Sequence, residues 1–109
     1  MSRLILAAIV AIGIPAVSVA AGNVESGKAL YSARCQACHG SEGKGNPAVA
    51  KVMKVTIPDL GSKEVQSKSD KQLEQDISKG SGRMPAVTGL SSEQLADIVA
   101  YVRTFGKKS

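Results

Sequence analysis

The 109-residue chain is poor in the side chains that most functional sites need. It has two cysteines, one histidine, one phenylalanine, two tyrosines and no tryptophan. A zinc site takes four ligands, and the cysteines and the histidine together supply three. The scarcity of aromatic side chains also disfavours nucleic-acid binding, because proteins bind single strands by stacking bases on aromatic platforms.

The chain also lacks an apolar run long enough to cross a membrane. A positive charge at Arg3 precedes an apolar stretch over 4–17 and a run of small residues that ends at Ala21. This stretch is shorter than the roughly 20 residues that span a bilayer, and the pattern is typical of a secretory signal peptide. We therefore predict a cleaved signal peptide over 1–21 and one domain over 22–109, with no stable membrane insertion after cleavage.

Removal of this segment leaves a small, basic domain. It has 13 basic residues against 9 acidic ones, a net charge of +4. A domain of this length with so few large side chains builds only a marginal core. A buried apolar cofactor would supply the missing mass.

Both cysteines and the histidine lie in one short segment, C-Q-A-C-H at 35–39. Two cysteines separated by two residues and followed by histidine form the attachment pattern of c-type haem. Cys35 and Cys38 can form thioethers with the two vinyl groups, and His39 then lies where an imidazole can ligate the iron. The segment therefore predicts one haem c attached through these cysteines.

Two other interpretations use the same letters. A thioredoxin-like redox pair also has the C-x-x-C spacing, but it belongs beside a sheet, and no strand periodicity lies near these residues. A structural disulfide would suit an exported protein, but it gives no reason for His39. Haem attachment accounts for all three side chains.

The chain resembles a class I c-type cytochrome of the small bacterial monohaem kind over residues 22–105. The resemblance rests on C-Q-A-C-H-G at 35–40, on G-R-M-P-A at 82–86 and on L-A-D-I-V-A-Y-V at 95–102. It implies an all-α small cytochrome c fold, with three main helices and short helical turns wrapped around one covalent haem. It also implies that Gly27 and Tyr31 let the first helix cross the last one closely.

Capping residues predict four helices. These run from 24 to about 33, from 47 to about 53, from 70 to 79 and from 92 onward, with the caps Asn23, Asn46, Ser69 and Ser91. Each serine precedes a glutamine at the position that completes a capping box. Residues 52–57 also fit a strand, and that alternative stays open.

The sixth iron ligand decides between a carrier and an enzyme. With no second histidine, methionine is the candidate, and after signal cleavage only Met53 and Met84 remain. Met53 fits an ordinary packing residue. The Met-Pro loop of the resembling family implies that Met84 ligates the iron, although Met84 too could be a packing residue. The expected metal ligands are therefore His39 and Met84.

Three further expectations concern the surroundings of the haem. Pro58–Leu60 should lie against a haem edge. The resemblance implies that a backbone carbonyl near Asn46–Pro47 accepts a hydrogen bond from the second ring nitrogen of His39. Whether Arg83 pairs with a haem propionate stays open.

The predicted function is that of a periplasmic, monomeric electron-transfer protein that shuttles one electron between redox proteins and performs no bond chemistry. Its positive charge predicts partners with acidic docking surfaces, unless the lysines are only a solvated surface. Nucleic acid is not an expected partner, because exported basic chains rarely meet it and no aromatic platform is interleaved with the charges. One rival is a haem-based sensor or peroxidase-like enzyme, for which a distal histidine is lacking. Another is a bound subunit of a larger exported dehydrogenase or oxidase.

Overall fold

The structure is a computed structural model that describes residues 22–107, so the predicted signal peptide at 1–21 lies outside the described residues. Residues 22–107 form six helices and no strand. The helices are α1 (Val24–Arg34), α2 (Gln36–His39), α3 (Pro47–Met53), α4 (Lys63–Gln66), α5 (Asp70–Lys79) and α6 (Ser92–Gly106). The predicted all-α fold, with three longer helices and short helical turns, is confirmed.

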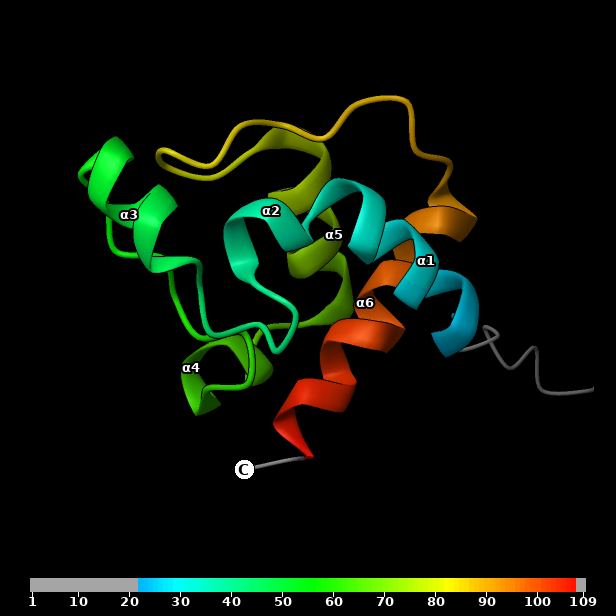
Figure 1. Cartoon of the computed structure of the whole chain (residues 1–109). Coiled ribbons are helices and arrows are strands. Elements are labelled where there is room, and N and C mark those ends of the chain that lie inside the picture. Colours follow the sequence, from blue (N-terminus) through cyan, green and yellow to red (C-terminus); the bar gives the residue numbers. More distant parts are fainter. Residues whose placement is uncertain (1–21, 108–109) are drawn as a thin grey trace, which may run out of the picture.

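Helix α1 crosses α6 at close range (Figure 1), and a glycine permits the approach. A Cβ atom at Gly27 would lie 2.6 Å from the carbonyl carbon of Asp97 and closer still to its oxygen. One turn further along α1, the Tyr31 ring is 1% exposed and lies with its centroid 5.2 Å from that of Tyr101 and 5.4 Å from that of Phe105. The close crossing expected at Gly27 and Tyr31 is confirmed.

Helices α5 and α6 supply most of the remaining core. Their buried side chains are Leu73, Ile77, Ile98, Val99, Val102 and Phe105. Both helices begin at the predicted serine caps, because each hydroxyl accepts a hydrogen bond from the N–H three residues on. At Ser91 the Gln94 side chain also accepts from the Ser91 N–H, which completes the capping box. At Ser69 only the hydroxyl half of the predicted box forms.

The segment between α2 and α5 wraps round one side of the molecule (Figure 1). Helix α3 begins at the predicted cap Asn46 and ends at Met53. The strand alternative at 52–57 is wrong, because residues 55–59 run as irregular chain that pairs with no strand. Helix α4 was not predicted; it is a single turn capped by the Ser62 hydroxyl, with Val65 buried against α6.

The C-cap residue that follows helix α3 is strained. Lys54 adopts φ 55° and ψ 47°, the left-handed conformation that glycine tolerates best, and it is the one non-glycine residue with positive φ in the described chain. We expect Lys54→Gly to raise the free energy of unfolding by about 0.5–1 kcal/mol. The measurement is guanidinium unfolding followed by circular dichroism.

The matched control is Lys51→Gly, which removes the same charge from an exposed position inside the same helix. There glycine should lower the free energy of unfolding by about 1 kcal/mol. Equal signs for the two variants would show that the conformation of Lys54 costs nothing.

Candidate functional site

The cysteine–histidine segment lies at the junction between α1 and α2. Cys35 ends α1 by donating its backbone N–H to the Tyr31 carbonyl (2.8 Å), and its own carbonyl accepts from the His39 N–H (3.0 Å). The tight turn brings Cys35, Cys38 and His39 to one cavity. The Cys35 side chain is buried and that of Cys38 is exposed, and both thiols are free. Burial raises the pKa of the Cys35 thiol, which the neighbouring Arg34 partly opposes.

The cavity has a volume of about 540 Å³ and opens between the wrapping segment and the α5–α6 pair. Volumes of about 300–1,000 Å³ are usual for cofactor sites. Its walls are mostly apolar and include Pro58 and Leu60. That the 58–60 segment lies against a haem edge stays a prediction. Polar side chains are few, as in sites that bind a large apolar cofactor and orient it with a few groups.

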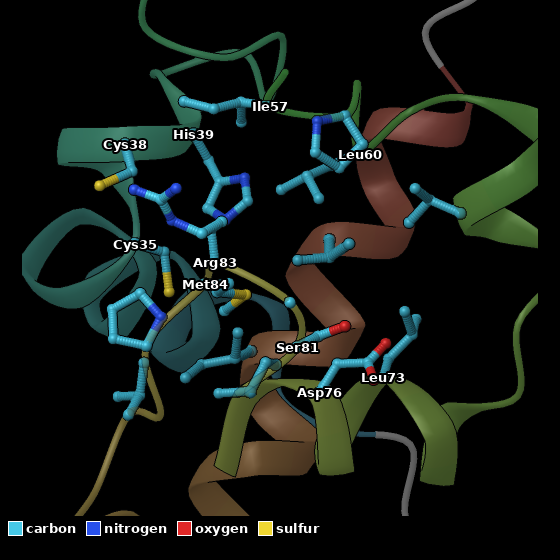
Figure 2. A pocket seen from close by; sticks show the side chains of 18 of the residues that line it. Cys35, Cys38, His39, Ile57, Leu60, Leu73, Asp76, Ser81, Arg83 and Met84 are labelled. Atoms are coloured by element: carbon cyan, nitrogen blue, oxygen red, sulfur yellow. The ribbon is translucent and has the colours of Figure 1, made fainter. Parts of the chain in front are cut away.

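Met84 reaches the same cavity on a tight turn after α5 (Figure 2). Ser81 and Met84 exchange two backbone hydrogen bonds, of 3.1 and 2.9 Å. The turn packs closely on Gly80, where a Cβ would lie 2.7 Å from the Met84 carbonyl oxygen. The Val87 N–H then donates to the Ile77 carbonyl of α5 (2.8 Å). The half-buried Met84 side chain is thus carried by backbone anchored to α5.

Two arginines connect the loop that carries Met84 to α1 and to the end of α3. Arg34, beside Cys35, donates to the Thr88 carbonyl (3.1 Å), and Arg83 donates to the Met53 carbonyl at the end of α3 (3.2 Å). These bonds join segments that are 54 and 30 residues apart in the chain. The guanidinium of Arg83 therefore has a backbone partner, and its pairing with a propionate stays a prediction.

Both methionines of the described chain line the cavity. Met53 is half-buried and is not part of the buried core cluster. The structure therefore places Met53 at the site as well as Met84, where the sequence had favoured simple packing. Ligation of the iron by Met84 stays a prediction.

The His39 ring is held in a form suited to metal binding. Burial lowers its pKa and so favours the neutral imidazole, the form that has a nitrogen lone pair available for a metal. Its buried Nδ1 has no hydrogen-bond partner among residues 22–107. The expected acceptor, a carbonyl near Asn46–Pro47, does not bind the ring here. Instead this loop contacts the backbone of the segment, since the Gly45 N–H donates to the His39 carbonyl (2.7 Å).

The cavity also contains an ion pair that was not predicted from the sequence. Lys68 Nζ lies 3.2 Å from Asp76 Oδ2, and both side chains line the cavity. The two residues stand eight positions apart, one before α5 and one within it. The spacing of these two residues in the sequence does not predict an ion pair, because only the packing of α5 brings the two side chains together.

The residues present fit a covalently bound haem. Two free thiols at one edge of the cavity can each form a thioether, and a neutral imidazole and a thioether can each ligate iron. Among residues 22–107 no group forms a hydrogen bond with His39 Nδ1, so no bond at that atom competes with such a role. An all-helical fold wrapped around a cavity with this donor set defines a small c-type cytochrome.

Comparison with known proteins agrees with this class. The family described as "Cytochrome C oxidase, cbb3-type, subunit III" matches residues 22–102. The solved structure named "KustC0563 c-type cytochrome" is similar with a TM-score of 0.62 and 26% sequence identity, over 72% of this chain and 95% of that one. Among curated protein sequences there is no significant match. The chain belongs to the cytochrome c family so described, whose general role is electron transfer with covalently bound haem.

No helix among residues 22–107 is both long enough and apolar enough to span a bilayer.

Proposed function

We propose that the protein is an exported, periplasmic one-electron carrier with one haem c, attached through Cys35 and Cys38 and ligated by His39 and Met84. The observation that carries the proposal is that these four side chains, from segments more than 40 residues apart, line one apolar cavity. Haem c supplies the Fe(II)/Fe(III) couple. The chain's own groups attach it, orient it and keep water away from it.

The two iron ligands have different supports. His39 sits on the backbone of α2 and the loop that follows, whereas Met84 sits on the turn anchored to α5. A second strong ligand closes the iron to small molecules, and methionine ligation raises the reduction potential. The pair therefore favours a carrier over an enzyme.

Haem attachment is tested on the protein exported from a host that attaches haem c. The intact mass should equal the chain from about Gly22 onward plus one haem, with no free thiol. The haem should stay with the protein in acid–acetone. The double variant Cys35→Ser/Cys38→Ser should lose the covalent haem. Free thiols, or a Cys35–Cys38 disulfide without haem, would contradict the proposal.

Positive charge gathers around the cavity and supports an acidic redox partner. Arg34, Lys68 and Arg83 line the cavity against one carboxylate, Asp76. Electron exchange with an acidic partner should therefore slow as salt rises from about 10 mM to 200 mM, because screening sets in beyond about 8 Å at physiological ionic strength. The measurement is stopped-flow kinetics at several salt concentrations. A rate that does not depend on salt would mean that the charges are only a solvated surface.

A second candidate is a subunit of a larger exported oxidase. The description of the matching family favours it, because that family is named for a subunit of an oxidase. Size-exclusion chromatography of the native protein distinguishes the two candidates. The carrier should elute as a monomer, and a subunit should co-purify with its complex.

A further inference from the structure

One residue joins the haem-binding segment to the helix that follows it. The Asn46 side chain donates from Nδ2 to the carbonyl of Ala37, inside the C-Q-A-C-H segment (3.1 Å). Its Oδ1 accepts from the backbone N–H groups of Ala48 (3.0 Å) and Val49 (3.4 Å), which cap α3. Its own backbone N–H donates to the Cys38 carbonyl (2.8 Å). Asn46 thus forms hydrogen bonds with both α2 and α3.

The chemistry of the partners fixes the orientation of the Asn46 amide. A carbonyl such as that of Ala37 only accepts hydrogen bonds, so it must face the NH₂ group. The N–H groups of Ala48 and Val49 only donate, so they must face the oxygen. A flipped amide would break all of these contacts. The two ends of the side chain therefore have separate roles, the oxygen as helix cap and the nitrogen as a tie to the haem-binding segment.

The tie matters because no hydrogen bond from the described residues holds Nδ1 of the His39 ring. Its Nδ1 finds no partner among the described residues, whereas metal-bound histidines are usually oriented through the second ring nitrogen. The backbone around His39, by contrast, is held by hydrogen bonds. The carbonyls of Ala37, Cys38 and His39 all accept from the two residues Gly45 and Asn46.

We propose that Asn46 is a positioning residue for the iron: it sets the orientation of His39 through the Ala37 and Cys38 carbonyls, and thereby the reduction potential. This inference rests on the proposed haem site. When the Nδ2 tie is lost, the segment loosens and water approaches the haem from the His39 side. Water stabilises the more highly charged ferric state, so the potential falls.

The test is Asn46→Ser in the haem-loaded protein. Serine is as good a helix cap as asparagine, but it has no donor that reaches Ala37, and the net charge is unchanged. The equilibrium constant for reduction should fall about threefold or more, where tenfold equals 59 mV for one electron. The NMR resonances of the His39 ring in the reduced protein should shift as well.

Asn23→Ser is the matched control. Asn23 caps α1 through the same kind of bond, from its Oδ1 to the Ser26 N–H. It stands outside the residues that line the cavity. This variant should leave the potential and the His39 resonances unchanged while costing similar stability. If both serine variants shift the potential equally, general loosening explains the effect and the proposal is overturned.

If Asn46→Ser leaves the reduction potential and the His39 ring resonances unchanged, Asn46 is only a helix cap and the proposal is overturned. If Asn46→Ser cannot be loaded with haem, Asn46→Asp decides, because it keeps the shape and the capping oxygen but has no N–H for Ala37. The His39 resonances are then the readout, since the added charge alone would move the potential. Wild-type protein without haem would instead refute the proposed function, so the two failures are distinguishable.

Discussion

Met84→Leu is expected to open the sixth position of the iron. Leucine keeps nearly the same volume and removes the sulfur, so the fold should lose less than about 1.5 kcal/mol. Without the thioether, water or a lysine should take the position. The reduction potential should fall by on the order of 0.1 V or more, because axial ligands set haem potentials over a range of about 0.8 V. The variant should also bind carbon monoxide and cyanide more readily than the wild type.

Met53→Leu is the matched control for this experiment. Met53 lines the same cavity, and the bond from Arg83 goes to its backbone carbonyl, which the substitution leaves in place. This variant should keep the weak near-infrared band that is typical of sulfur ligation in the family. If Met53→Leu loses that band and Met84→Leu keeps it, the ligand is Met53. If neither matters and the wild type binds carbon monoxide readily, the carrier function fails.

Gly27→Ala should destabilise the protein by about 2 kcal/mol or more, although alanine is the better helix former. Helix propensity alone would favour alanine by about 1 kcal/mol. Against this, the new Cβ would collide with the backbone carbonyl of Asp97 and lie 3.0 Å from Tyr101 Cβ. Backbone cannot yield as a flexible side chain can, so α1 would have to move away from α6, at a cost at the upper end of the range for overpacking. Thermal and guanidinium unfolding measure the loss.

Ser26→Ala, one position earlier on the exposed surface of α1, is the control. It carries the same new residue without the collision, so its stability should stay within about 0.5 kcal/mol of wild type. A Gly27→Ala protein as stable as wild type, or more so, would show that α1 and α6 do not approach as closely as in this structure.

Local chemistry accounts for what could be predicted correctly. The caps at Asn23, Asn46, Ser69 and Ser91 depend on bonds that reach only two or three residues along the chain. The spacing of Cys35, Cys38 and His39 likewise needs nothing beyond one turn of backbone. Gly27 was readable because the resembling fold places a small residue where two helices cross. Helix α4 escaped prediction because a single turn buries too little to leave a periodic pattern.

By itself, the sequence determined the class of protein and the residues that are predicted to form its haem site, because the attachment motif and the capping signals are short-range features. Only the tertiary structure decided what faces the cavity. In the structure, Met53 lines the cavity together with Met84, and Lys68 pairs with Asp76. Arg83 donates a hydrogen bond to the end of α3. The tertiary structure also left His39 Nδ1 without the expected acceptor and gave Asn46 its second bond, to Ala37. Such contacts depend on how separate segments pack against each other, and no spacing along the chain encodes them.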